Sequence, residues 1–68
     1  MKFECLQFGS MKYGKWARGL FKFGEFCNIK SIYEIKSDID LEPKKTYNVK
    51  HIDIVERRNG SLSFILEI

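Results

Sequence analysis

The residues best suited to binding chemistry lie between Met11 and Phe26, where aromatic rings and cations are interleaved. This stretch, MKYGKWARGLFKFGEF, contains Tyr13, Trp16 and three phenylalanines, and it has three lysines and one arginine against a single acid. Cations neutralise phosphate groups, and an aromatic ring stacks on a nucleobase whatever its identity. The combination therefore favours binding to a flexible polyanion that carries bases.

Strand periodicity divides these side chains into two sets, because successive side chains of a strand point to opposite faces. One face of residues 16–23 has Trp16, Arg18, Leu20 and Lys22, and the other has Ala17, Gly19, Phe21 and Phe23. We expect the second set to be core and the first to form a cationic surface that carries the indole. The alternative is that the rings are only core and the cations only solvated. The predicted nucleic-acid-binding residues are Lys12, Tyr13, Lys15, Trp16, Arg18 and Lys22.

Other chemistries lack the residues that they require. His51 is the single histidine, and together with Cys5 and Cys27 it falls short of a zinc-binding set. The acids of residues 38–42 alternate, but they lack the glycine and the distal glutamate of a calcium loop. No nucleophile elbow and no glycine-rich phosphate loop occurs. We therefore expect a protein that is not an enzyme and that uses neither a metal nor another cofactor.

Length and charge indicate one small domain with a basic first half. The 68 residues are 44% hydrophobic and 31% charged, which predicts a single folded domain over residues 1–68. Residues 1–36 contain seven Lys or Arg against three acids, whereas residues 37–68 contain five against six. An anion-binding surface is therefore expected in the first half of the chain.

The residues after Met1 bear on the cellular location of the protein. They include no apolar run of the length that a signal peptide or a membrane span requires. We expect a cytoplasmic protein that makes no membrane contact. In that compartment, Cys5 and Cys27 are expected to be reduced, buried thiols.

The first half of the chain predicts strands that would position the aromatic and basic residues. Residues 2–8 alternate weakly, with Phe3 and Cys5 on one side and Phe8 on the other, and a loop at residues 11–14 leads into the strand 16–23. Gly19 marks the position of a bulge or a sharp bend. A short turn is expected at Gly24.

The middle of the chain has a less regular pattern. Residues 26–36 show both helical spacing and alternation, but their β-branched and aromatic content favours a strand with a bulge at Ser31. A short helix is the alternative there. Residues 37–45 contain the only proline, Pro43, and predict a connection with at most one helical turn.

The last third predicts two further strands and the fold class. Residues 46–56 form a long strand whose apolar side chains change face near residues 50–52, and Asn59-Gly60 is a strong hairpin signal before the strand 61–68. Five strand-like segments predict an all-β fold, namely a small five-stranded antiparallel barrel. An OB-like barrel is preferred, with an SH3-like barrel as the alternative.

Two stretches resemble parts of small OB-fold proteins that bind single-stranded nucleic acids and are common in bacteriophages. GKWARGLFKFGEF is similar to their basic aromatic second strand, and LEPKKTYNVKHIDIVERRNGSLSFILEI is similar to their closing half. The nearest pattern is that of the helix-destabilising proteins of filamentous phages. Cold-shock domains are similar in length, but FKFGEF departs from their KGFGF-type motif and the matching VFVH segment is missing.

These observations support two functions. The first is binding of single-stranded DNA, or less favourably RNA, by stacking and phosphate contacts. The alternative is a small phage-type protein-interaction module or inhibitor that docks on a host protein. Because 15% of the chain is aromatic, we also expect self-association, most simply as a homodimer. The contact is expected to use some of Phe8, Phe26, Tyr33, Ile54 and Ile65.

Overall fold

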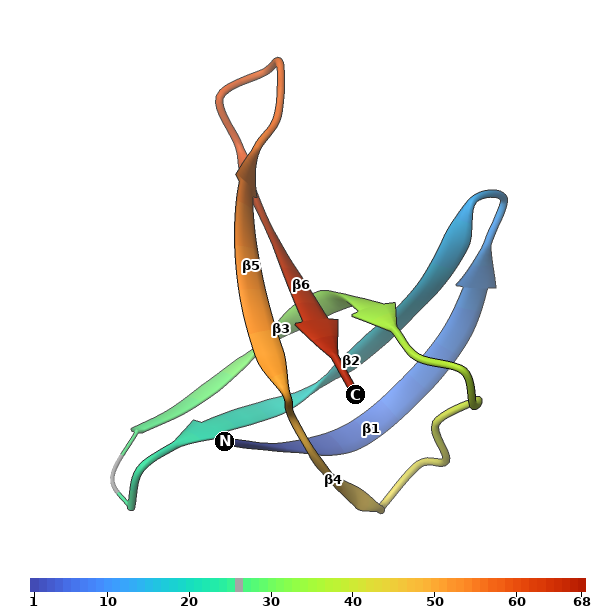
Figure 1. Cartoon of the computed structure of the whole chain (residues 1–68), viewed down its shortest axis with the longest axis vertical. Coiled ribbons are helices and arrows are strands. Elements are labelled where there is room, and N and C mark those ends of the chain that lie inside the picture. The colour runs from blue at the N-terminus through green and yellow to red at the C-terminus, as the bar shows by residue number, and fades with distance from the viewer. Residues whose placement is uncertain (26) are drawn as a thin grey trace.

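Strands alone make up the regular structure of the described chain (Figure 1). The computed structural model describes residues 1–25 and 27–68, with Cys27 described by its backbone only. The prediction of an all-β fold is confirmed for these residues, and the predicted strand position Phe26 lies outside them. The strands are β1 (Lys2–Met11), β2 (Gly14–Phe23), β3 (Cys27–Lys36), β4 (Thr46–Asn48), β5 (His51–Glu56) and β6 (Leu62–Glu67).

One mixed sheet contains all six strands in the order β4-β1-β2-β3-β6-β5. Neighbouring strands are antiparallel except β3 and β6, which run parallel. The prediction of a purely antiparallel sheet is therefore wrong. The predicted strand 46–56 is divided at Val49 and Lys50, which gives six strands in place of five. This division lies at the start of the region where the buried face was expected to change.

The sheet curls, because its two ends are consecutive in the chain. β4 and β5 stand at opposite ends of the strand order, yet only Val49 and Lys50 separate them. The N–H of Val49 donates to the Met1 carbonyl at 2.9 Å, and the N–H of Lys50 donates to the Glu67 carbonyl at 2.8 Å. These two bonds attach the junction to both ends of the sheet.

The core lies on one face of the curled sheet, which we call the inner face. Tyr33 is only 2% exposed, and its ring centroid lies 5.4 Å from that of Phe3 and 6.1 Å from that of Phe64. Its hydroxyl donates to the Ile29 carbonyl at 2.8 Å. Tyr33 is therefore a central core ring. The prediction that it contributes to a self-association surface is wrong. The buried core residues are Phe3, Cys5, Ala17, Phe21, Tyr33, Ile35, Leu41, Val49 and Leu66.

The predicted division of β2 into two faces is largely confirmed. Ala17, Gly19 and Phe21 are buried, whereas Arg18 is exposed and Trp16 is half-buried on the opposite, outer face. Phe23 departs from the prediction, because it is the last residue of β2 and is 60% exposed. The buried side chains of β2 therefore end at Phe21, whereas the alternation predicts that they continue to Phe23.

A bulge on β1 lies opposite Gly19. Cys5 pairs with Gly19 and Gln7 pairs with Arg18, so Leu6 is an extra residue on β1. The inserted residue reverses the alternation of the residues after it, because side chains of a strand change face at every position. Phe8 therefore lies opposite Ala17 and packs against the core, on the same side as Cys5 and not on the opposite side as expected.

The predicted bulge at Ser31 is absent, because the β2–β3 register runs without a shift from Lys15 opposite Ile35 to Phe23 opposite Cys27.

The connection 37–45 contains a turn at Pro43 and no helical turn. The ion pair of Lys45 with Glu42 raises the pKa of the Lys45 ammonium.

Cys5 is a free, fully buried thiol, as expected. Burial raises the pKa of this thiol, because the thiolate would lose its hydration in the core. The predicted state of the Cys27 thiol lies outside what the structure describes.

No helix among the described residues is long and apolar enough to cross a membrane.

We predict that Gly19→Ala destabilises the fold. A Cβ atom on Gly19 would lie 2.1 Å from the Glu4 carbonyl oxygen and 2.7 Å from the Phe3 ring, so the backbone of β1 would have to move. Overpacking of this kind costs about 1 to 3 kcal/mol, measured as the free energy of unfolding in urea. Gly14→Ala is the matched control, because its Cβ would meet nothing closer than 3.7 Å. Equal stability of the two variants would contradict the prediction.

Candidate nucleic-acid interface

The outer face of β1, β2 and β3 is defined by their register, because directly opposite residues of antiparallel strands share a face. Lys2 lies opposite Lys22, and Ile32 lies opposite Arg18. Lys30 lies opposite Leu20, which makes it a diagonal neighbour of both Arg18 and Lys22. Two cations that sequence reasoning did not select, Lys2 and Lys30, therefore join the predicted pair.

Positive charge on the outer face is only partly compensated. Its acids are Glu4 and Glu34, and the Glu4 carboxylate pairs with the Lys22 ammonium at 2.9 Å. The Glu34 carboxylate pairs with the Arg57 guanidinium at 3.0 Å. Among the described residues, none of the ion pairs involves Lys2, Lys12, Arg18 or Lys30. These four cations are therefore available to an anionic ligand.

Trp16 rests on the backbone of β1. It lies opposite Gly9, and a Cβ atom on Gly9 would stand only 2.5 Å from atoms of the indole. The ring can occupy this position only because Gly9 has no side chain. Trp16 is half-buried on the outer face and is not a plug of the core, which was the competing expectation.

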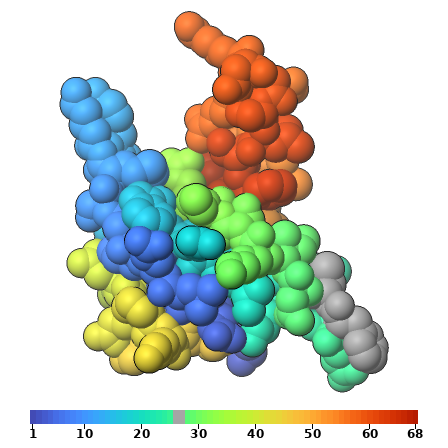
Figure 2. Space-filling model, turned by 180° about the vertical axis from the view of Figure 1, so that it is seen from behind, coloured from blue at the N-terminus to red at the C-terminus, as the bar shows by residue number. Residues whose placement is uncertain are grey.

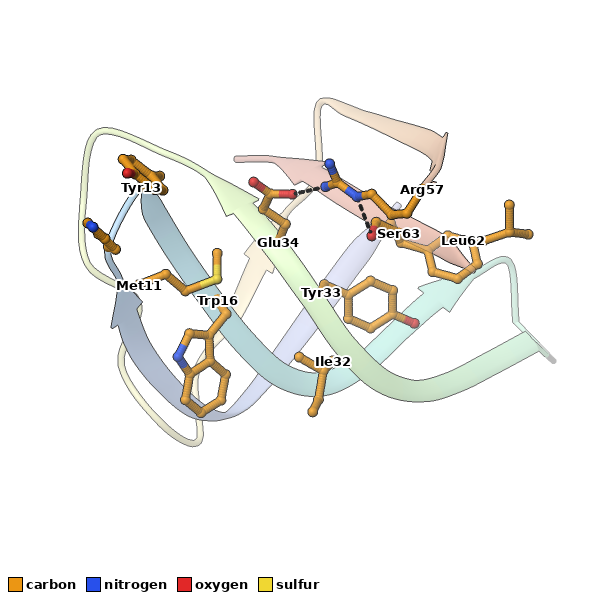
Figure 3. Close-up of a pocket in the computed structure, with 11 residues that line it drawn as sticks. Met11, Tyr13, Trp16, Ile32, Tyr33, Glu34, Arg57, Leu62 and Ser63 are labelled. Atoms are coloured by element: carbon orange, nitrogen blue, oxygen red, sulfur yellow. Dashed lines mark hydrogen bonds and ion pairs between the residues drawn. The ribbon is translucent and has the colours of Figure 1, made fainter. Parts of the chain in front are cut away.

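Two hairpins project from the sheet and enclose a groove between them. Figure 1 shows the β1–β2 turn and the β5–β6 turn rising on the same side of the molecule, and Figure 2 shows the hollow between these two arms from behind. The groove has a volume of about 470 Å³. Its lining includes Lys12, Tyr13, Trp16, Ile32, Glu34 and Arg57 (Figure 3).

The β1–β2 turn supplies an exposed ring and a cation. Tyr13 is 89% exposed, and the Lys12 ammonium lies 5.4 Å from the centroid of its ring. A cation within about 6 Å of a ring centroid is attracted to the ring face. A phosphate held by Lys12 would therefore leave its base within reach of an aromatic surface.

The opposite wall of the groove is built by the β5–β6 hairpin. The predicted turn at Asn59-Gly60 is present there, with Gly60 at a φ of +82°. Arg57 donates from Nη2 to Glu34 Oε2 at 3.0 Å and from Nε to Ser63 Oγ at 2.9 Å (Figure 3). The ion pair thus connects β3 to the hairpin along the groove.

The six predicted site residues fall into three groups. Lys12, Tyr13 and Trp16 line the groove, and Arg18 and Lys22 lie on the adjoining outer face. Lys15 is turned away from both, because its ammonium donates to the Ser37 and Ile39 carbonyls and pairs with the Asp40 carboxylate at 3.2 Å. These contacts attach the connection 37–45 to β2, which is a structural task.

Sequence reasoning missed Glu34 and Arg57 for different reasons. The alternation of Asn28, Lys30, Ile32 and Glu34 could have placed Glu34 on the outer face of β3. No local pattern could have paired it with Arg57, which is 23 residues away in the chain. Within the described residues, no three His, Cys, Asp or Glu side chains gather to hold a metal ion.

Comparisons with known proteins give no match to this chain. No protein-family model matches it, and neither the curated proteins nor the solved structures that were searched contain a match.

We predict that Gly9→Ala displaces the indole of Trp16. The added methyl group would occupy the space of the ring, so Trp16 should move into water and its fluorescence emission should shift to longer wavelength. Because this is the only tryptophan, the spectrum reports on one position. Gly14→Ala should leave the emission unchanged. An unshifted spectrum for a folded Gly9→Ala variant would show that the ring does not lie on Gly9.

Proposed function

We propose that this protein binds single-stranded DNA, or less favourably RNA, along the outer face of β1–β3 and into the groove between the two hairpins. The observation that supports the proposal most directly is that Tyr13, Trp16 and Lys12 line one groove, beside a face on which Arg18 has no ion pair among the described residues. Stacking on rings and contact with phosphates would then act on the same strand.

The dimensions of the site suit a single strand. A groove of about 470 Å³ is of the size that binds small organic groups in proteins, and it is open to the neighbouring sheet face. A duplex conceals its bases in a stack, whereas a single strand can place a base in the groove and its phosphates beside Arg18 and Lys30. The arrangement therefore favours unpaired nucleic acid.

We propose further that the fold is an OB-like barrel. If β4 and β5 are counted as one strand bent at Val49 and Lys50, five strands remain, and the two ends of the sheet meet at that strand. OB-folds are partly open five-stranded barrels that bind oligonucleotides on the face of strands two and three and on the loops 1–2 and 4–5. The groove described above lies between the corresponding loops, which supports both the barrel and the binding proposal.

A protein-interaction module remains the second candidate, and exposed apolar side chains favour it. Phe23 is 60% exposed and Ile29 is 51% exposed on the β2–β3 hairpin, and Ile54 is 62% exposed on β5. Side chains of this kind would suit a homodimer or a host-protein contact. A phage origin and a cytoplasmic location stay predictions that rest on the sequence.

We predict that Trp16→Ala weakens binding to poly-dT about ten-fold or more, because stacking on one base contributes roughly 1 to 3 kcal/mol. The dependence of affinity on salt should stay nearly unchanged, since no charge is lost. Binding is measured by fluorescence anisotropy of labelled oligonucleotide at two salt concentrations. If a folded Trp16→Ala variant binds with undiminished affinity, the indole is not part of the binding site.

We predict that Arg18→Ala flattens the salt dependence of binding. Each phosphate contact on a single strand contributes about 0.7 to the slope of log affinity against log salt, and Arg18 has no competing acid among the described residues. Lys22→Ala should flatten it less, because Glu4 already holds that ammonium. Lys50→Ala is the control, since Lys50 lines a separate, smaller hollow. If the wild-type protein binds neither poly-dT nor poly-U at low salt, the nucleic-acid proposal is overturned in favour of the interaction module.

A further inference from the structure

We propose that Glu34 selects bases in the groove, and that its free carboxylate oxygen accepts a hydrogen bond from the exocyclic amino group of cytosine. The site would then bind cytosine-containing single strands in preference to thymine-containing ones. This inference rests on the proposed function and adds a base preference to it.

The Glu34 carboxylate is oriented by one ion pair, made by its Oε2 with Arg57. Arg57 Nη2 donates to Oε2 at 3.0 Å, and Arg57 itself is anchored because its Nε donates to Ser63 Oγ at 2.9 Å. An acceptor whose partner is itself fixed by a second bond has little freedom to rotate. Arg57 is therefore a positioning residue for Glu34.

The other oxygen of Glu34, Oε1, is turned toward the β1–β2 hairpin. It lies 4.0 Å from the position that a Cβ atom on Gly14 would occupy. No hydrogen bond from the described residues is made to Oε1. Figure 3 shows Glu34 and Tyr13 among the residues that line the groove, with one carboxylate oxygen of Glu34 bonded to Arg57. An acceptor is thus presented to the groove.

Two aromatic residues line the same groove as this acceptor. Glu34 is directly opposite Trp16 in the β2–β3 register, and both residues line the groove together with Tyr13. A base stacked on either ring would present its edge to the groove wall. A ring sets no base preference, so the choice of base falls to the polar group at the edge.

A carboxylate distinguishes the two pyrimidines by their donors and acceptors. Cytosine carries an amino group at the position where thymine carries a carbonyl oxygen, and Glu or Asp accepts from that amino group. At that position thymine would instead place an acceptor against an acceptor, and no hydrogen bond could form between them. Glu34 therefore favours cytosine by attraction and disfavours thymine by repulsion.

Glu4 provides a matched control for Glu34. Both acids lie on the outer face and both pair with a cation, Glu4 with Lys22 at 2.9 Å and Glu34 with Arg57 at 3.0 Å. Only Glu34 lines the groove. Glu4→Gln and Glu34→Gln thus remove the same charge from the same face, and only the second variant changes the groove.

The experiment compares oligo-dC with oligo-dT of equal length, using the intact chain and fluorescence anisotropy at one salt concentration. The wild-type protein should bind oligo-dC about ten-fold more tightly, the discrimination expected of a good contact between a side chain and a base edge. Glu34→Gln should bring the ratio close to one, because an amide can turn either its donor or its acceptor to the base. Glu4→Gln should raise both affinities and keep the ratio.

A second variant tests the positioning residue. Arg57→Gln leaves Glu34 in place but removes its anchor, so the preference for oligo-dC should fall while oligo-dT is still bound. Equal wild-type affinity for the two oligonucleotides, or a ten-fold preference that survives Glu34→Gln, would overturn the role of Glu34 and leave the nucleic-acid proposal intact. Wild-type protein that binds neither oligonucleotide would overturn both.

Discussion

The close approach of β1 and β2 at Gly19 is the constraint on which the rest of the structure depends. A Cβ atom at this position would lie 2.1 Å from the Glu4 carbonyl, so only glycine allows the two backbones to pass at this distance. The bulge at Leu6 lies directly beside this contact and bends the strand. A chain of this size that contains no helix in its described part must bury one face of its sheet against itself, and this bend makes that possible.

Both the core and the groove result from the curled sheet. On the inner face, Phe3, Phe21 and Phe64 gather around the ring of Tyr33 at centroid distances of 5.4 to 6.1 Å. At the rim, the same curvature brings the β1–β2 and β5–β6 hairpins to one side, where the groove lies between them (Figure 1). The candidate site is thus a consequence of how the sheet curls over its core.

Some cations of this small surface make structural contacts, and others have no ion pair among the described residues. Lys15 stabilises the connection 37–45, and Lys22 and Arg57 are each held by one acid. Exposed pairs of this kind contribute little to stability, about 0 to 1 kcal/mol, but they determine which cations can meet a ligand without first leaving a partner. Among the described residues, Arg18 and Lys30 have no ion-pair partner to leave. They are diagonal neighbours on adjacent strands.

Local features of this protein were determined by its sequence. The alternation of Ala17 and Phe21 with Trp16 and Arg18 assigns the two faces of β2, because strand periodicity needs no distant information. The turns at Gly24 and Gly60 are determined in the same way, since both residues adopt a positive φ that favours glycine. Only the tertiary structure decided that Leu6 is inserted against Gly19 and moves Phe8 inward, that Lys15 bonds to the connection 37–45, and that Arg57 meets Glu34. These outcomes depend on register between strands distant in sequence, and a one-residue change of register moves every later side chain to the other face.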